Sequence, residues 1–375
     1  MKTTRTPWIA VLFAGGILAS AGAEPSLKEA FEADFLLGGA VNTRQVSGAS
    51  PSEVPIILRH FNTITAENAM KWGPIHPRPG EYAFEPADRF VEFGERHGMV
   101  IIGHTLVWHS QTPGWVFREQ DGSPPSREVL LERMRDHIHA VVGRYKGRVR
   151  GWDVVNEALN EDGTLRPSPW LKIVGEDYLE KAFRFAQEAD PKAELYYNDY
   201  SLEGPRKRDG AIRLLRKLQG AGVKVTGVGL QGHYGLEHPS ARQIDETIEA
   251  FAGLGLQVMI TELDVNVLPT PGSGGADISA QYGADPKWNP YPDGLPPEVE
   301  DRLARRYAEL FQVFLKHRQV VSRVTFWGVS DQSSWLNHFP IRGRTNHPLL
   351  FDRAGQPKPA FRAVVNLGRA GSGAD

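Results

Sequence analysis

The chain has 375 residues, 43 basic and 45 acidic side chains, and no cysteine. The lack of cysteine excludes disulfides, cysteine-ligated zinc or iron–sulfur sites, and a thiol nucleophile. The near balance of charge offers no general attraction to nucleic acid or anionic lipid, so neither is an expected partner. The length suits one large α/β barrel or two ordinary domains.

The first residues have the layout of a secretory signal peptide. Lys2 and Arg5 form a basic start, Trp8–Ala19 is an apolar run, and Ala21–Ala23 supplies small residues for cleavage. We therefore expect a leader over residues 1–23, cleavage near Ala23, and export to a periplasm or the cell exterior. A buried N-terminal helix is the alternative. No later apolar run reaches the roughly 18 residues of a membrane span.

The remaining chain alternates between short apolar runs and longer amphipathic stretches. The expected strands are Phe35–Val41, Thr63–Ala66, Val100–Leu106, Val149–Val155, Glu194–Asn198, Val225–Leu230, Gln257–Thr261 and Arg323–Trp327. The expected helices include Pro86–His97, Ser126–Tyr145, Tyr178–Ala189, Arg208–Leu218, Ala241–Gly253 and Glu298–His317. Eight strand–helix units predict an α/β fold, a parallel sheet closed into a single (β/α)8 TIM barrel.

An open doubly wound sheet is the competing architecture. It would normally carry a glycine-rich phosphate loop after an early strand, and Gly38-Gly39 is too weak to be that loop. We assign residues 24–368 to one barrel domain and residues 369–375 to a flexible C-terminal tail. In a barrel of this kind the chemistry lies at the C-terminal ends of the strands.

Two glutamates stand at such strand ends. Residues 152–157 read WDVVNE and place Glu157 after the fourth strand, while residues 260–264 read ITELD and place Glu262 at the seventh. A carboxyl pair is what cleavage of a glycosidic bond requires, because one group must donate a proton and the other must attack or stabilise the anomeric carbon. The alternative is that each is a salt-bridged barrel residue.

Five further motifs accompany this pair. Residues 65–72 read TAENAMKW, 103–109 read GHTLVWH, 197–200 read YNDY, 229–233 read GLQGH and 326–331 read FWGVSD. From about Phe35 to Val365 the chain resembles the endo-β-1,4-xylanases of glycoside hydrolase family 10. The resemblance implies a retaining mechanism on xylan, with Glu157 as the acid/base and Glu262 as the nucleophile, and with no cofactor.

The residues themselves argue for roles consistent with that resemblance. Glu157 needs a raised pKa and so should have apolar or anionic neighbours, whereas donors should hold Glu262 ionised. Gln231 and His233 are two residues apart, so on one extended segment they would point to the same side and reach the mouth together. The resemblance places His233 against the nucleophile, and a satisfied buried histidine is the alternative.

The other candidate residues come from the resemblance. Asn156 is similar to the residue that contacts the sugar 2-hydroxyl, although it would also suit a turn. Glu67, Asn68 and Lys71 resemble contacts to the non-reducing-side xylose units, although a charged cluster can simply be a solvated helix start. The remaining candidates resemble residues around the cleavage point: His104 and Trp108 its floor, Trp327 and Trp335 its aromatic walls. Trp152 and Trp170 are better interpreted as core.

The expected partner is xylan or a xylo-oligosaccharide, bound by a monomer. Xylose lacks the hydroxymethyl group of glucose, and the resemblance suggests that Trp335 and Lys71 crowd that space. A retaining β-1,4-glucanase or cellobiosidase on the same fold is one alternative. A non-catalytic xylan-binding barrel is another, although the presence of both Glu157 and Glu262 argues against it.

A long loop between Leu268 and Pro297 follows the nucleophile strand and is rich in Pro, Gly and Asp. It holds Tyr282, Trp288 and Tyr291, and we expect it to shape the leaving-group side of the cleft. Its acidic residues, Asp277, Asp285 and Asp293, match no EF-hand spacing, so no metal site is predicted.

Overall fold

The structure is a computed structural model that describes residues 25–271, 276–279 and 281–372. The predicted leader, 1–23, lies outside the described residues. The last helix, α12 (Pro359–Ser372), extends beyond the domain end expected at residue 368, and residues 373–375 of the expected tail are also outside the description.

In the part of the chain that the structure describes, nine strands form one parallel system. They are β1 (Leu36–Val41), β2 (Thr63–Ala66), β3 (Val100–Trp108), β4 (Gly151–Asn156), β5 (Glu194–Asp199), β6 (Gly227–Leu230), β7 (His233–Gly235), β8 (Gln257–Asn266) and β9 (Val321–Phe326). Neighbours pair in the order β6-β5-β4-β3-β2-β1-β9-β8, and β6 also pairs with β8, which closes the sheet. The predicted (β/α)8 barrel is therefore confirmed, and β7 is a short extra strand beside the end of β8.

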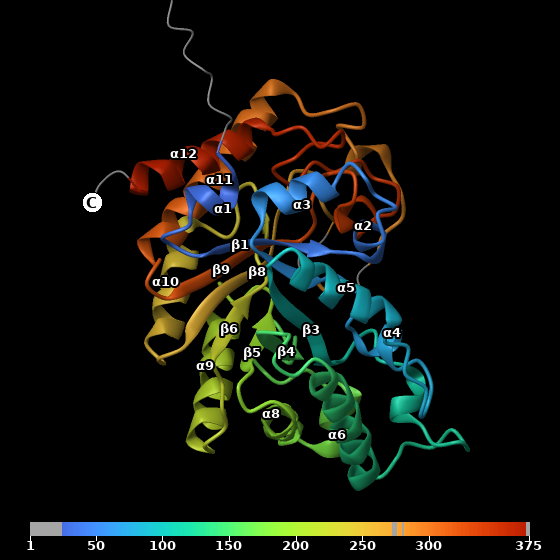
Figure 1. Cartoon of the computed structure of the whole chain (residues 1–375). Coiled ribbons are helices and arrows are strands. Elements are labelled where there is room, and N and C mark those ends of the chain that lie inside the picture. Colours follow the sequence, from blue (N-terminus) through green and yellow to red (C-terminus); the bar gives the residue numbers. More distant parts are fainter. Residues whose placement is uncertain (1–24, 272–275, 280, 373–375) are drawn as a thin grey trace, which may run out of the picture.

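Helices surround the barrel (Figure 1). They are α1 (Leu27–Ala30), α2 (Thr43–Val46), α3 (Val54–His60), α4 (Trp72–Ile75), α5 (Glu85–Arg96), α6 (Arg127–Arg144), α7 (Pro169–Val174), α8 (Tyr178–Ala189), α9 (Pro205–Gly220), α10 (Ala241–Ala252), α11 (Pro297–Lys316) and α12. The described residues also form short 3₁₀ turns, η1 (Gly114–Phe117), η2 (Pro286–Trp288) and η3 (Trp335–Asn337). Among the described residues, no helix is both long and apolar enough to cross a membrane.

Local sequence explains where these helices begin. The Ser126 hydroxyl accepts a hydrogen bond from the Val129 amide and caps α6. Ser240 caps α10 in the same way by accepting a bond from the Gln243 amide, and its own backbone amide donates in return to Gln243 Oε1. These caps satisfy amide groups that would otherwise lack partners in the first helical turn.

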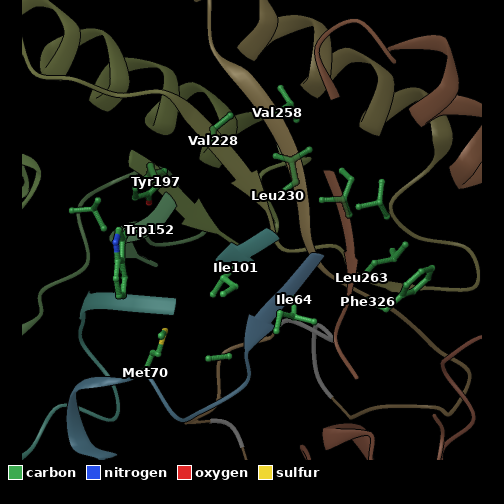
Figure 2. Close-up of a cluster of buried hydrophobic side chains, with 14 of the residues drawn as sticks. Ile64, Met70, Ile101, Trp152, Tyr197, Val228, Leu230, Val258, Leu263 and Phe326 are labelled. Atoms are coloured by element: carbon green, nitrogen blue, oxygen red, sulfur yellow. The ribbon is translucent and has the colours of Figure 1, made fainter. Parts of the chain in front are cut away.

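The core lies in and around the strands. Figure 2 shows buried apolar side chains from successive strands, among them Ile64, Ile101, Val228, Val258 and Phe326. Strands covered on both faces bury nearly continuous apolar runs, as these do. Trp152 and Trp170 are each 1% exposed, which agrees with their expected place in the core. Gly103 makes room for Trp152, since a Cβ atom there would lie 2.1 Å from the indole.

The two ends of the described chain pack together. Helix α1 lies beside α12, as the blue and red helices of Figure 1 show. Gly368 permits this approach, because a Cβ atom at that position would lie 2.4 Å from the Ala30 carbonyl oxygen. Since α1 directly precedes β1, this contact lies at the end of the barrel where the strands begin.

Candidate active site

One pocket collects residues from the C-terminal ends of most strands. Every candidate named from the sequence lines it: Glu67, Asn68, Lys71, His104, Trp108, Asn156, Glu157, Gln231, His233, Glu262, Trp327 and Trp335. Gln111, Ala276 and Ile278 complete the lining. The parallel barrel explains this gathering, because it brings all strand ends to one rim.

Glu157 is the first residue after β4, where its backbone turns with φ +58°. The residue is 4% exposed, and its carboxyl group accepts bonds from Trp108 Nε1 at 2.8 Å, Gln231 Nε2 at 2.9 Å and Asn156 Nδ2 at 3.1 Å. The β3–β4 register supplies the first contact, since Trp108 pairs with Asn156. The group is thus held at both oxygens.

The environment of Glu157 favours its protonated form. Burial and the negative charge of Asp199 raise the pKa of Glu157 to about 7, and the charge of Glu262 adds to this effect. The donated bonds from Gln231 and Trp108 act in the opposite direction but do not outweigh burial. The sequence-based expectation of anionic neighbours is therefore matched by Asp199 and Glu262.

Glu262 lies inside β8 and is 5% exposed. Asn198 Nδ2 donates to its Oε1 at 2.8 Å, and His233 Nε2 lies 3.2 Å from its Oε2. Burial alone would raise the pKa of Glu262, but the His233 hydrogen bond and the charges of His104 and His233 outweigh burial, so the pKa lies below the ordinary value. This carboxyl group is held ionised.

A chain of amides connects the two carboxyl groups. Asn198 Nδ2 donates to Asn156 Oδ1 at 2.9 Å as well as to Glu262. Asn156 and Gln231 in turn both donate to Glu157. Asn198 is fully buried. Its position beside Asn156 follows from the strand register, because the two residues pair across β4 and β5. The two carboxyl groups therefore share one rigid polar network.

His233 bridges two carboxylates. Its Nδ1 lies 3.1 Å from Asp264 Oδ1, while its Nε2 faces Glu262. Burial alone would lower the pKa of His233, but Asp264 and Glu262 outweigh burial and raise it to about 10. Asp264 also accepts a bond from Trp335 Nε1 at 2.7 Å, which fixes the indole at the pocket wall.

The expectation that Gln231 and His233 share one extended segment is wrong. β6 ends at Leu230, and Gly232 has φ +81°, which breaks the extended backbone between the two residues. His233 begins β7, where it pairs with Asp264 of β8. Both side chains still reach the pocket, but Gln231 contacts Glu157 and His233 contacts Glu262.

A polar group follows β2 on another side of the pocket. Lys71 is 7% exposed and donates to Asn68 Oδ1 and Gln111 Oε1, both at 2.9 Å. Asn68 donates to Glu67 Oε1 at 3.0 Å. Burial lowers the pKa of Lys71, an effect partly offset by Glu262, Glu67 and Glu157. These side chains offer several donors and acceptors at fixed positions, which suits a ligand rich in hydroxyl groups.

Aromatic and imidazole rings form the floor and walls. His104 Nδ1 lies 2.9 Å from Asp153 Oδ2, which orients its ring. The His104 and Trp327 rings meet edge to face at 5.3 Å. Trp335 stacks on Phe339 with ring centroids 4.6 Å apart and an interplanar angle of 11°. Each wall residue is thus fixed before a ligand arrives.

The long loop after β8 contributes to the pocket at Ala276 and Ile278. Two of its acidic residues have basic partners, since Asp277 pairs with Arg166 at 3.1 Å and Asp285 with Lys287 at 2.9 Å. Elsewhere in the described residues, Asp245, Glu249 and His317 could hold a metal ion, but the Lys316 ammonium already contacts both of those carboxylates. The expected absence of a metal or cofactor stays a prediction.

The sequence-based candidate set lacked Asn198, Asp264 and Gln111, and it also lacked the loop residues Ala276 and Ile278 of the pocket lining. Asn198 and Asp264 lie within quoted motifs and hold the Glu262 and His233 side chains, and strand-end position could have identified both. Gln111 binds Lys71 from a loop where it has φ +51°. No sequence pattern signals that contact.

Comparison with known proteins identifies the family. The family model described as glycosyl hydrolase family 10 matches residues 26–367. Endo-1,4-beta-xylanase A of Xylanibacter ruminicola is 44% identical over 94% of this chain and 95% of its own length. A thermostable celloxylanase of Thermoclostridium stercorarium is 40% identical over 92% of this chain and 88% of its own length.

A solved structure gives the same result in three dimensions. The structure of a novel GH10 endoxylanase retrieved from a sugarcane soil metagenome is 46% identical, covers 92% of this chain and 99% of its own, and superposes with a TM-score of 0.87. The resemblance inferred from the motifs is thereby confirmed. With the family model matched across the barrel and relatives matched nearly end to end, the chain belongs to glycosyl hydrolase family 10.

Proposed function

We propose that this chain is a secreted endo-1,4-β-xylanase that cleaves internal β-1,4 linkages of xylan with retention of configuration. The observation that carries the proposal is the pair of buried carboxyl groups in one pocket, with the pKa of Glu157 raised and that of Glu262 lowered. Relatives named endo-1,4-beta-xylanase support the choice of substrate.

The first step forms a covalent glycosyl–enzyme intermediate. The ionised Glu262 carboxylate attacks the anomeric carbon, and the bond from that carbon to the leaving oxygen breaks. Protonated Glu157 gives its proton to the departing oxygen, so the leaving chain departs as a neutral alcohol. Each carboxyl group is in the protonation state that its task requires near neutral pH.

The second step reverses these roles. Glu157, now ionised, takes a proton from water, and the water oxygen attacks the anomeric carbon. The ester bond to Glu262 breaks and the carboxylate is restored. Two inversions give net retention. Asn156 contacts Glu157 directly and is connected to Glu262 through Asn198, and in the pocket it can donate to the sugar 2-hydroxyl as charge develops.

His233 and Asn198 prepare the nucleophile. His233 carries a proton on each ring nitrogen when charged, and so donates to both Glu262 and Asp264. Asn198 donates to the other Glu262 oxygen. These bonds fix the carboxylate in the attacking orientation and keep it ionised.

The preference for xylan rests on Trp335 and Lys71. Both are held by other side chains, Trp335 by Asp264 and Lys71 by Asn68 and Gln111, so neither yields easily to a larger sugar. We expect the hydroxymethyl group of glucose to clash there. Initial rates on nitrophenyl β-xylobioside and β-cellobioside measure the preference, and equal rates would favour the glucanase alternative.

The mechanism is tested by reducing-end release from xylan. Glu157→Gln and Glu262→Gln should each lose at least about 100-fold of the wild-type rate. Equal activity in all three proteins would exclude this mechanism, and a wild type without activity would favour the non-catalytic binding barrel. Lys217→Met, which removes an exposed ion pair with Glu176, is the matched control and should keep the wild-type rate.

Azide distinguishes the two roles. In Glu262→Gly, azide should take the place of the nucleophile and give the α-glycosyl azide from an activated substrate. In Glu157→Ala, azide should attack the covalent intermediate and give the β-glycosyl azide. The opposite assignment of anomers would reverse the proposed roles.

The proposal of secretion rests on the basic, apolar and small-residue pattern of residues 1–23. N-terminal sequencing of the exported protein should begin at Glu24. A full-length protein that stays in the cytoplasm would contradict it. We also propose a monomer, for which light scattering should give the mass of one chain.

A further inference from the structure

Arg166 connects the loop after β8 to the backbone of Glu157. Its Nε donates to the Glu157 carbonyl oxygen at 3.2 Å, and its Nη2 donates to the Tyr200 hydroxyl at 2.6 Å. Its Nη1 donates to Asp277 Oδ2 at 3.1 Å. With a side chain 15% exposed, this guanidinium is mostly removed from water, which strengthens each of these contacts.

Asp277 organises a short turn of that loop. Its Oδ1 accepts bonds from the Ser279 amide at 3.0 Å and the Ser279 hydroxyl at 2.7 Å. The residues on each side of Asp277, Ala276 and Ile278, line the catalytic pocket. One carboxylate therefore shapes the turn with one oxygen and fastens it to Arg166 with the other.

The position of this turn indicates which part of the substrate it meets. A general acid stands on the leaving-group side of the bond, because it protonates the departing oxygen. Arg166 holds the turn next to Glu157, the proposed acid. Lys71 and Asn68 are the expected contacts on the non-reducing side of the cleaved bond. Lys71 binds Asn68 and Gln111 there, and not Arg166 or the turn.

We propose that Ile278 contacts the first sugar of the leaving group, and that the Arg166–Asp277 ion pair positions it there. Ile278 is then a specificity-determining residue, whose apolar side chain covers the C–H face of a xylose ring, while Arg166 and Asp277 are positioning residues. This inference rests on the proposed xylanase function. It gives the loop that follows β8 a part in substrate binding.

Two substrates separate this role from catalysis itself. Xylopentaose places sugars on the leaving-group side, whereas β-xylobiosyl fluoride has a single leaving atom that cannot reach the turn. Ile278→Ala should lower kcat/KM about tenfold on xylopentaose and leave it within about twofold on the fluoride. The basic limb of the pH profile on xylopentaose should stay unchanged, because Glu157 is not displaced.

The ion pair is tested by a double-mutant cycle. Asp277→Asn keeps the shape of the side chain and should lower kcat/KM on xylopentaose about threefold. In the Ile278→Ala background the same change should have little further effect, because the contact that it positions is gone. Lys287→Met, which removes the Asp285–Lys287 pair in the same loop outside the pocket lining, is the matched control and should match wild type.

Three results would overturn the inference. Equal losses on both substrates would indicate a general defect, and no loss on xylopentaose would remove the contact. Additive losses in the double variant would separate Asp277 from Ile278. Hydrolysis of β-xylobiosyl fluoride by the wild-type protein does not depend on any of these three results. A wild type that fails to hydrolyse the fluoride would therefore contradict the proposed function, and not the role of Ile278.

Discussion

Strands β4 and β8 each deliver a buried glutamate to the same pocket but surround it differently. Glu157 is 4% exposed and Glu262 is 5% exposed, so burial does not distinguish them. The negative charge of Asp199 raises the pKa of Glu157, whereas His233 and the charge of His104 lower the pKa of Glu262. Because burial raises the pKa of both groups, the difference between them comes from the charges and donors nearby.

The largest expected effect comes from removing one carboxylate at a time on an activated substrate. On β-xylobiosyl fluoride, Glu262→Gln should lose at least about 10⁴-fold in kcat/KM, because no other group attacks the anomeric carbon. Glu157→Gln should lose far less, because fluoride needs no proton to depart. Steady-state rates of fluoride release measure both, and similar losses would mean that the two sites have equivalent roles.

The His233 partner of Glu262 provides the next test. His233→Gln removes the positive charge, so the pKa of Glu262 should rise and the acid limb of the kcat/KM profile should move to higher pH. The rate at the optimum should fall about 10- to 100-fold. The exposed His97→Gln is the control. An unmoved acid limb would show that His233 does not set the charge of the nucleophile.

Asp199 tests the other half of the comparison. Its negative charge opposes ionisation of Glu157, so Asp199→Asn should lower the pKa of Glu157 and move the basic limb of the kcat/KM profile to lower pH. The acid limb should stay in place. The pH profile on xylopentaose is the measurement. A basic limb that moved upward would contradict the assigned sign, and a thermal melt near that of wild type would exclude a general folding defect.

A buried group without a charged partner of opposite sign should show the smallest effect. His137 stacks on Trp72 at 3.7 Å, and burial lowers its pKa well below 6.5. The unfolded chain then binds a proton below about pH 6.5 that the folded chain does not, so stability falls as the pH falls. His137→Gln should flatten the decline in melting temperature between about pH 6.5 and 4. A slope equal to that of wild type would contradict the expectation.

The barrel was predictable because each strand is a short apolar run followed by an amphipathic helix. Thr63–Ala66 and Tyr178–Ala189 have the predicted bounds. The position of the candidates at the C-terminal ends of the strands was enough to predict that they share one pocket. Periodicity specifies which face of each helix is buried, and closure of the parallel sheet brings the C-terminal ends of the strands to one rim.

Contacts made by loops were not predictable in the same way. Gln111 reaches Lys71 from a loop, and Gly232 alters the backbone between two residues that appeared to share a segment. A glycine permits such a turn but does not require it, so the sequence cannot choose. The Arg166–Asp277 pair joins residues far apart in the chain, and only the folded structure brings them together.

The packing of α12 on α1 has a practical consequence. Both helices meet at the end of the barrel where the strands begin, whereas the pocket opens where the strands finish. A tether attached beyond either helix would therefore leave the enzyme with its cleft directed away from the support. Immobilisation through these ends would leave the pocket free, since neither attachment competes with a substrate for the same face.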